Sequence, residues 1–269
     1  RVPYLFPKAG PLRWQAMRAL ARAAAGVIVT NPEDGATLRA AGLTRVREIP
    51  IGSNIAPSAL DGFDPAAWRA ARGIPAETTL IGYFGFLNES KGGETLLRAL
   101  AALRGQGRDV GLLLIGGQTG ASDATNVAYA RVIEGLAADL NVTAQVFRTG
   151  FVDDRGVSEA FAACAGLALP YRDGVSLRRG TLMAAFAHGV PIVTTTPRLP
   201  IAGLEQGEAF LLVPPDDPPA LSAAIARLLD DDALRARLRA GSLRASGRFA
   251  WPAIAAETAS FFAACGAKG

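Results

Sequence analysis

Cysteine, histidine and lysine are all scarce in this chain of 269 residues, which holds two cysteines, one histidine and three lysines. Two cysteines are too few for a disulfide framework or for a thiolate metal cluster. The simplest interpretation of that scarcity is a reducing, cytoplasmic setting. Cys164 ends an apolar helical stretch, and we expect it to be a small core residue.

Long hydrophobic runs are absent as well. No apolar run reaches the roughly 20 residues that span a bilayer, and the first residues have no signal-peptide pattern. No Gly-x-Gly-x-x-Gly motif opens a helix, because Gly82-Tyr-Phe-Gly85 and Gly116-Gly117-Gln-Thr-Gly120 have other spacings. The sequence therefore disfavours a dinucleotide-dependent dehydrogenase.

The charge of the chain is mildly positive, with a formal net charge of +4 and a pI of about 9.4. Its arginines are scattered, and no basic run with interleaved aromatic residues is present. Such a balance fits an anionic small ligand or an anionic membrane surface better than nucleic acid. Half of the residues are hydrophobic, so a sizeable core is available.

Short, continuously apolar runs alternate with helical stretches after residue 78. Such runs are typical of strands that are covered on both faces, and their alternation with helices predicts an α/β fold with a doubly wound parallel sheet. We expect strands at residues 80–84, 110–115, 144–147, 166–169, 192–195 and 210–213. Helices are expected at 12–25, 32–42, 90–103, 125–140, 154–164, 179–188, 218–229, 232–241 and 251–265, and short strands at 27–29 and 46–49.

Two loops of the predicted sheet suit a phosphate group. Residues 85–92 connect a strand to a helix and include Lys91, and residues 170–179 follow another strand and end in Arg178 and Arg179 beside a helix. Helix N-termini and nearby cations bind anions. Because both loops leave the carboxyl edge of one parallel sheet, they predict a nucleoside-diphosphate ligand there.

Each residue of these loops also has a purely structural interpretation. Lys91 could be a solvated lysine in the first turn of a helix, and only one of the two adjacent arginines is expected to face a ligand. Ser176 could be a turn residue. The predicted diphosphate-binding residues are Gly85, Lys91, Gly92, Ser176, Arg178 and Arg179.

Two further features have structural interpretations that we prefer. His188 precedes Gly189 at the end of a predicted helix, where capping or packing is the usual role. The acidic run at residues 230–232 is expected to end one helix and cap the next rather than to bind a metal.

Five segments, in this order and spacing, resemble family 4 (group 1) retaining glycosyltransferases of the GT-B fold. The segments are Ile49-Pro-Ile-Gly-Ser53, Gly85-Phe-Leu-Asn-Glu-Ser-Lys91-Gly92, Gly150-Phe-Val-Asp153, Ala187-His-Gly-Val-Pro-Ile-Val193 and Pro214-Pro-Asp-Asp217. The resemblance covers essentially the whole chain. It implies an enzyme that binds a nucleotide sugar in its carboxy-terminal Rossmann-like domain, generally without a metal or another cofactor.

The resemblance also implies a domain organisation. Residues 51–250 would be the nucleotide-sugar-binding domain, and residues 1–50 a truncated remnant of the acceptor-binding domain, so we expect the chain to be a fragment. Residues 251–269 would form a helix that crosses back to the first segment. The catalytic residues are unknown and are expected largely in the missing part, so the fragment alone should be inactive.

Further site residues follow from the same resemblance. The loop Gly150-Phe151-Val152 would contact the nucleoside, and Asp173 the donor sugar or nucleoside, although Asp173 could instead cap a turn.

The chain departs from the family pattern at two places. Phe86 stands where many members have arginine, and Ser176 and Ala184 stand where many have two glutamates. Asp173 could replace a glutamate, and Arg178 or Arg179 could supply the missing positive charge.

The leading hypothesis is therefore a hexosyltransferase-like enzyme that transfers a sugar from a nucleotide-diphosphate sugar to an unknown acceptor. The acceptor could be a glycan, a lipid-linked molecule or a small molecule. A non-catalytic nucleotide-sugar-binding or scaffold protein remains the alternative, and a GT-B epimerase is disfavoured by the single histidine. We expect a cytoplasmic protein with no nucleic-acid partner; peripheral contact with the inner membrane face, through the missing domain, stays open.

Overall fold

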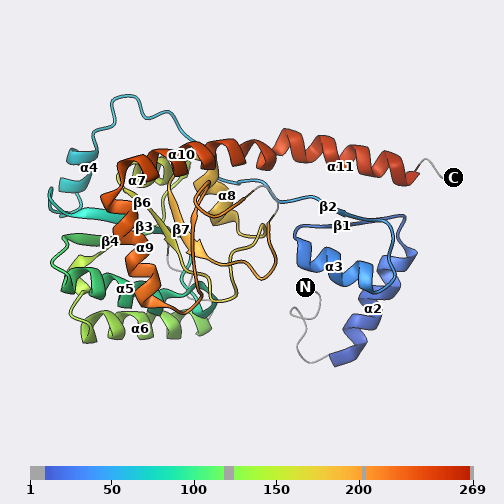
Figure 1. The fold of residues 1–269 in the computed structure, drawn as a ribbon, viewed down its shortest axis with the longest axis horizontal. Helices are drawn as coiled ribbons and strands as arrows, with labels where there is room; N and C mark the ends of the chain where they lie inside the picture. The colour runs from blue at the N-terminus through green and yellow to red at the C-terminus, as the bar shows by residue number, and fades with distance from the viewer. Residues whose placement is uncertain (1–9, 118–123, 202–203, 267–269) are drawn as a thin grey trace. The chain divides into compact units, whose positions relative to one another are not determined.

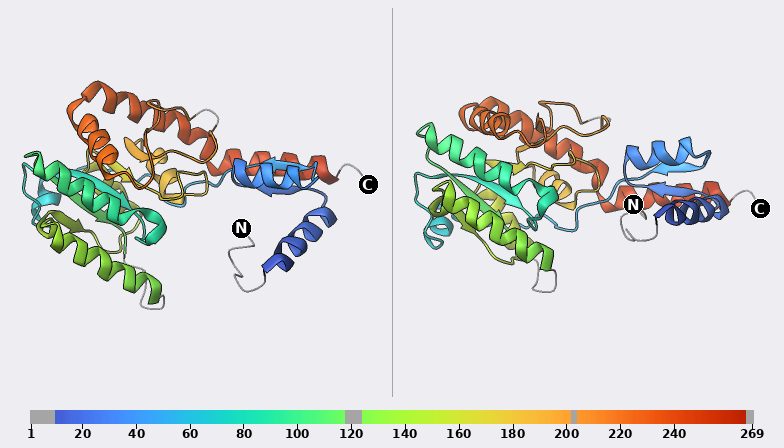
Figure 2. Two further views of the ribbon diagram at one scale, coloured as in Figure 1. Left: turned by 60° about the horizontal axis from the view of Figure 1, so that its bottom comes forward. Right: turned by 90° about the horizontal axis from the view of Figure 1, so that it is seen from below.

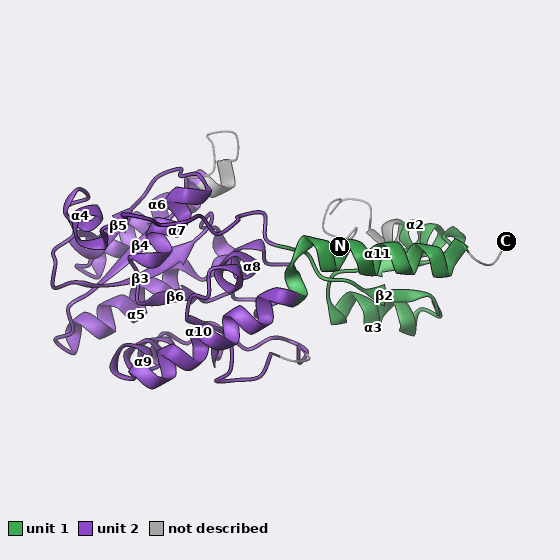
Figure 3. Cartoon of the chain, turned by 90° about the horizontal axis from the view of Figure 1, so that it is seen from above, with its two compact units in different colours: residues 1–52, 248–269 green, residues 53–247 purple. Residues whose placement is uncertain are grey.

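The structure is a computed structural model that describes residues 10–117, 124–201 and 204–266 (Figure 1). The chain forms two compact units, one made of Arg1–Gly52 with Arg248–Gly269 and the other of Ser53–Gly247 (Figure 3). The predicted division into a nucleotide-sugar-binding domain and a remnant of an acceptor-binding domain, at residues 50 and 250, stays a prediction. The compact units of the structure meet after Gly52 and before Arg248.

The larger unit is built on a six-stranded parallel sheet with the order β5-β4-β3-β6-β7-β8. The strands are β3 (Thr79–Phe84), β4 (Val110–Ile115), β5 (Val146–Arg148), β6 (Gly166–Leu169), β7 (Ile192–Thr195) and β8 (Leu211–Val213). Every residue of β4, β6 and β7 is buried, because helices cover both faces of the sheet (Figure 2). The predicted doubly wound α/β fold is confirmed.

The helices of this unit connect the strands in sequence. They are α4 (Pro65–Ala70), α5 (Gly93–Gly105), α6 (Ala124–Asp139), α7 (Asp154–Ala162), α8 (Gly180–Ala187), α9 (Pro218–Asp230) and α10 (Asp232–Ser246). Short 3₁₀ turns are η2 (Glu89–Lys91) and η3 (Thr143–Gln145). The cap of α9 is Asp217, which accepts a hydrogen bond from the amide of Ala220, and Pro218 occupies the first helical position.

Three helices differ from the prediction. The sequence pattern missed α4, which Asp64 caps by accepting from the amide of Ala66 and which buries Trp68. The helix predicted from residue 90 begins only at Gly93, because Gly92 adopts a left-handed conformation with φ of 70° after η2. The predicted stop of α10 at Gly241 is wrong.

Gly241 instead allows close packing within α10. A Cβ atom at this position would lie 1.8 Å from the carbonyl oxygen of Glu208. The helix therefore continues to Ser246, and the absence of a side chain lets the backbone of another segment touch it.

The order of the strands creates a switch point between β3 and β6. From β3 the chain proceeds outward through β4 to β5, and then it returns to the middle to form β6, β7 and β8 on the other side. Ile81 and Gly82 pair with Gly166 and Leu167 at this junction. Ligands of open α/β sheets bind outside the carboxyl ends of the strands at such a point.

The smaller unit joins the two ends of the chain. It contains α2 (Gly10–Ala23), β1 (Val27–Val29), α3 (Pro32–Ala40) and β2 (Val46–Glu48), with η4 (Gly247–Phe249) leading into α11 (Trp251–Gly266). β1 and β2 pair in parallel. Ile254 and Phe261 of α11 pack with Ile28 and Ile49, so the last helix contacts the first segment of the chain. None of the described helices has the length and apolar character that a membrane span requires.

Candidate functional site

The loops that follow β3 and β6 leave the sheet next to each other, because these strands are parallel neighbours. The first loop passes through η2 to α5, and the second leads to α8. The N-cap residues of the two helices are Gly92 and Arg179, and neither gives a side-chain cap hydrogen bond. The two loops predicted from the sequence therefore meet at the switch point of the sheet.

Lys91 and Arg179 converge on a single aromatic ring, that of Tyr171. The Nζ atom of Lys91 lies 5.1 Å from the ring centroid, and the Cζ atom of Arg179 lies 4.5 Å from it. Both distances are within the range at which a cation is attracted to a ring face. The prediction that positive charge from two loops would gather at one place is thus met by Lys91 and Arg179.

Arg179 is further fixed by an ion pair with Asp173. The side chains of these residues are only 14% and 22% exposed, so the pair is largely shielded from solvent. The Nε atom of Arg179 is buried and has no hydrogen-bond partner among the described residues. The guanidinium thus keeps one donor free beside the pair, and Asp173 sits at the site as a partner of this arginine.

The surroundings of Lys91 disfavour the charged form of its ammonium group. Burial, and secondly the charge of Arg179, lower the pKa of Lys91 to about 8, although Asp173 acts in the opposite direction. A lysine whose charged form is disfavoured in this way gains from a bound anion.

Tyr171 was not among the site residues predicted from the sequence. Its ring is 1% exposed, and its hydroxyl forms a hydrogen bond of 2.5 Å with that of Thr181 in the first turn of α8. Its carbonyl oxygen accepts a hydrogen bond of 2.6 Å from the hydroxyl of Thr195. The signal available in the sequence was an aromatic residue two positions after a strand, in the loop that contains the arginines.

Gly85 and Gly92 adopt positive φ angles of 107° and 70°. A Cβ atom at Gly85 would lie 2.8 Å from Cγ2 of Thr181, and one at Gly92 would lie 1.9 Å from the carbonyl oxygen of Pro170. Gly85 therefore lets the loop after β3 pack against the start of α8, and Gly92 lets it pack against the loop after β6. The contact with Pro170 gives Gly92 a packing role that is independent of a ligand.

The start of α5 is already occupied by a side chain. The hydroxyl of Tyr129 on α6 lies beside Gly93, where a Cβ atom would be 3.2 Å from it. Burial, the largest influence, raises the pKa of Tyr129, whereas the nearby amides of Gly93 and Glu94 lower it. Because Lys91 belongs to η2 and precedes this helix, its expected place in the first turn of α5 is wrong. Of the two helix N-termini, α8 is the one that remains available to an anion.

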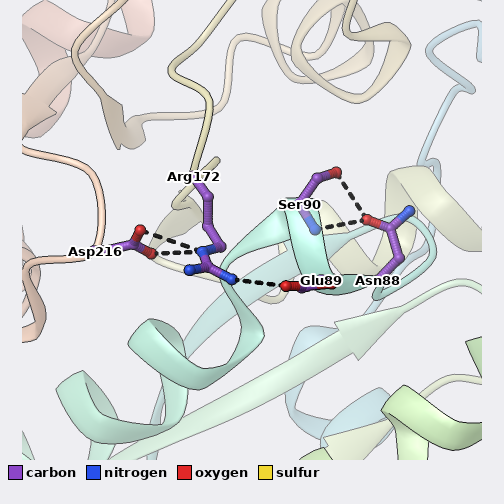
Figure 4. Close-up of polar contacts among 5 residues, drawn as sticks. All are labelled: Asn88, Glu89, Ser90, Arg172 and Asp216. Carbon is purple, nitrogen blue, oxygen red and sulfur yellow. Dashed lines mark hydrogen bonds and ion pairs between the residues drawn. The ribbon is translucent and has the colours of Figure 1, made fainter. Parts of the chain in front are cut away.

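Arg172 ties the two loops together from the outside (Figure 4). Its Nε donates to Asp216 at 3.0 Å, its Nη1 donates to Glu89 at 3.3 Å, and its amide donates to the carbonyl oxygen of Ser90 at 3.1 Å. The amide and hydroxyl of Ser90 in turn donate to Asn88. The sequence alone did not reveal this network, which joins residues from three separate loops.

The predicted nucleoside loop lies at the same edge of the sheet, after β5. Gly150 pairs with Gly116, and the amide of Gly116 donates to the hydroxyl of Thr149 at 3.1 Å. Phe151 is 87% exposed, and Val152 is half-buried beside Gly156. Glycines thus hold the ends of β4 and β5 close together.

The remaining predicted residues have less specific surroundings. Ser176 is half-buried and its carbonyl oxygen accepts from the amide of Arg179. Arg178 is also half-buried. Phe86 is 50% exposed and its carbonyl oxygen accepts from the hydroxyl of Tyr83.

Ala184 is completely buried inside α8. The position at which many family members have a glutamate therefore offers no side-chain hydrogen bond and no exposed surface in this chain.

His188 has the packing role that the sequence predicted. Its Nδ1 is 2.8 Å from the carbonyl oxygen of Ala184 and its Nε2 is 2.9 Å from the hydroxyl of Ser158. The ring contacts that of Phe161 edge-on. Burial is the main cause of its lowered pKa.

Acidic residues do not gather into a metal site in the part of the chain that the structure describes, where no group of three or more His, Cys, Asp or Glu side chains is placed to hold an ion. In the acidic run, Asp231 caps α10 through the amide of Leu234, and Asp230 pairs with Arg108. The run therefore ends one helix and begins the next.

A family model described as glycosyl transferases group 1 matches residues 78–231. The chain belongs to this family. Among its curated relatives, the D-inositol 3-phosphate glycosyltransferase of Corynebacterium glutamicum (strain R) is 33% identical over 210 residues, which are 75% of this chain and 47% of that protein. The corresponding protein of Corynebacterium efficiens is 32% identical, over 81% of this chain and 50% of its own length. The chain thus spans about half the length of these glycosyltransferases.

Solved structures of similar fold are GT-B glycosyltransferases, which confirms the predicted fold class. A sucrose-phosphate synthase from Thermosynechococcus elongatus superposes with a TM-score of 0.79 and 28% identity, over 98% of this chain and 64% of that one. The Anabaena protein Alr3699/HepE in complex with UDP gives a TM-score of 0.80 with 21% identity, over 96% and 69% of the two chains. The second likeness shows the fold alone.

Proposed function

We propose that this glycosyltransferase chain binds the nucleoside diphosphate of a nucleotide-sugar donor, as the donor-binding part of an enzyme that transfers the sugar to an acceptor. The observation that carries the proposal is the meeting of Lys91 and Arg179 at Tyr171, at the switch point of the sheet. A similar fold has been solved with UDP bound, which supports UDP as the first probe.

The proposed role of the two cations is to neutralise the diphosphate. When a sugar leaves the donor, negative charge develops on the nucleoside diphosphate, and fixed positive groups stabilise that charge more than they stabilise the intact donor. Lys91 and Arg179 are such groups, and the N-terminus of α8, which no side chain caps, adds positive potential.

The nucleoside would extend along the sheet edge from β3 toward β5. These strands are two positions apart in the sheet, which corresponds to about 10 Å, a span comparable to an extended nucleoside. The loop 149–152 would then meet the base, with main-chain groups of Gly150 and the exposed ring of Phe151 available for contact.

Binding of UDP by the 269-residue chain, measured by calorimetry, tests the proposal. Replacing Lys91 or Arg179 by alanine should weaken binding by tenfold or more, because each removes a charge-assisted contact of roughly 1.5–3 kcal/mol. Arg239→Ala is the matched control, since this arginine is exposed on α10. Failure of the unmodified chain to bind UDP, or equal binding by all variants, would contradict the proposed site.

A second candidate is a nucleotide-sugar-binding protein without transferase activity. The burial of Ala184, in place of a glutamate common in the family, is the observation that favours it. Because the chain spans about half the length of its curated relatives, turnover must be assayed on the full-length protein. Release of sugar from a bound donor there would exclude this second candidate.

A further inference from the structure

We propose that Tyr171 is a positioning residue, whose buried ring holds Lys91 and Arg179 in the arrangement that receives the diphosphate. This inference rests on the proposed function and deepens it, since it names the group through which two loops act as one site. Tyr171 itself does not touch the ligand, because its side chain is almost wholly inaccessible.

The geometry places both cations against one ring. Lys91 comes from the loop after β3 and Arg179 from the loop after β6, and the contacts of 5.1 Å and 4.5 Å with Tyr171 are shared by the two side chains. Like charges repel each other, so two flexible cationic side chains need a common attraction to stay together. The ring supplies that attraction for both, and Asp173 adds to it for Arg179.

Tyr171 is itself held in place, at the hydroxyl of its ring and at its backbone carbonyl. Its hydroxyl is hydrogen-bonded to Thr181, its carbonyl oxygen accepts from Thr195, and Gly174 donates its amide to the same carbonyl oxygen. Lysine and arginine side chains lose much conformational freedom when they are ordered. If that freedom is already lost before the ligand arrives, binding costs less.

The pKa of Lys91 is a measurable quantity that would not change if Tyr171 had only a structural role. The covering of its ammonium group lowers the pKa of Lys91 to about 8, from the ordinary value of 10.5. Removal of the ring would let water reach this group and would move the pKa back toward 10.5. A variant that only loosened the core elsewhere would leave that pKa unchanged.

The experiment compares three variants of the 269-residue chain: Tyr171→Leu, Tyr171→Phe and, as the matched control, Phe210→Leu. Phe210 is also fully buried in the larger unit, and it stacks on Phe186. Calorimetry gives the affinity for UDP. NMR titration of ¹³C-labelled lysine gives the pKa of Lys91, with few signals because the chain holds three lysines; Lys91→Arg identifies the resonance.

Tyr171→Leu should weaken UDP binding by about tenfold and raise the pKa of Lys91. Tyr171→Phe, which keeps the ring, should bind within twofold of the unmodified chain, and Phe210→Leu should change neither quantity. Should Tyr171→Leu fail to fold, Tyr171→Met fills the space with a flexible side chain and is expected to behave in the same way.

Two results would overturn the inference: an unchanged pKa of Lys91 in the leucine or methionine variant, or equal losses of affinity in the leucine and phenylalanine variants. The NMR titration needs no nucleotide. It therefore still decides whether Tyr171 holds Lys91 if the unmodified chain binds no UDP, a result that would refute the proposed function instead.

Discussion

Gly92 lies directly against the carbonyl group of Pro170, so closely that a Cβ atom would stand 1.9 Å from the carbonyl oxygen. One residue belongs to the loop after β3 and the other to the loop after β6. This backbone contact joins the two loops at the switch point of the sheet, and it sets Lys91 and Tyr171, the adjacent residues in the two loops, beside each other.

Gly92→Ala should destabilise the larger unit by about 2 kcal/mol or more, because the new methyl group meets backbone and the residue keeps a positive φ. Urea unfolding followed by circular dichroism measures the change. Gly105→Ala is the control, since no neighbouring atom lies within 4 Å of a Cβ there; it should be neutral or slightly stabilising. Equal stability of both variants would mean that the two loops can separate without cost.

The affinity for UDP should fall as the pH rises above about 8, because Lys91 then loses its proton. A bound diphosphate favours the charged lysine, so its pKa rises in the complex and binding takes up a proton. Calorimetry between pH 7 and 10 measures this decline. Lys91→Arg keeps its charge over the whole range and should remove most of the decline; an equally steep decline in this variant would assign the titration to another group.

The stability of the protein should fall when the pH is lowered below about 6.5. His188 has its pKa lowered in the folded state by burial, so the unfolded chain binds its proton first as the pH decreases. The stabilisation is complete above the unfolded value and is lost toward the folded one. His188 is the only histidine of the chain, so His188→Gln should flatten the melting temperature between pH 7 and 5.5. An unaltered slope would assign this dependence to carboxylates.

Arg172→Ala should cost at most about 1 kcal/mol of stability, because its ion pairs with Asp216 and Glu89 are exposed. The same substitution should weaken UDP binding only a few-fold, since Gly92 and Tyr171 still hold the two loops. Thermal melts and calorimetry measure the two effects, and Asp216→Asn should reproduce them. A loss of UDP affinity as large as that of Lys91→Ala would place Arg172 in the binding machinery itself.

The local pattern of the sequence was sufficient for most of the fold. Strands β4, β6 and β7 occupy the predicted residues, because a strand that is buried on both faces is largely apolar along its whole length. Residues such as Asp217-Pro218 mark the start of a helix through their own backbone chemistry. Gly241 shows where that reasoning fails, because the same residue that ends many helices also permits close packing inside one.

The sequence by itself determined that the chain is a parallel α/β protein and that two loops with positive charge follow its strands. Only the tertiary structure decided that Lys91 and Arg179 both contact the ring of Tyr171, and that the hydroxyl of Tyr129 lies beside Gly93 at the start of α5. Secondary structure depends on neighbours a few residues apart, which a sequence displays. The site depends on side chains about 80 residues apart in the chain, and their contact arises only when β3 and β6 pair.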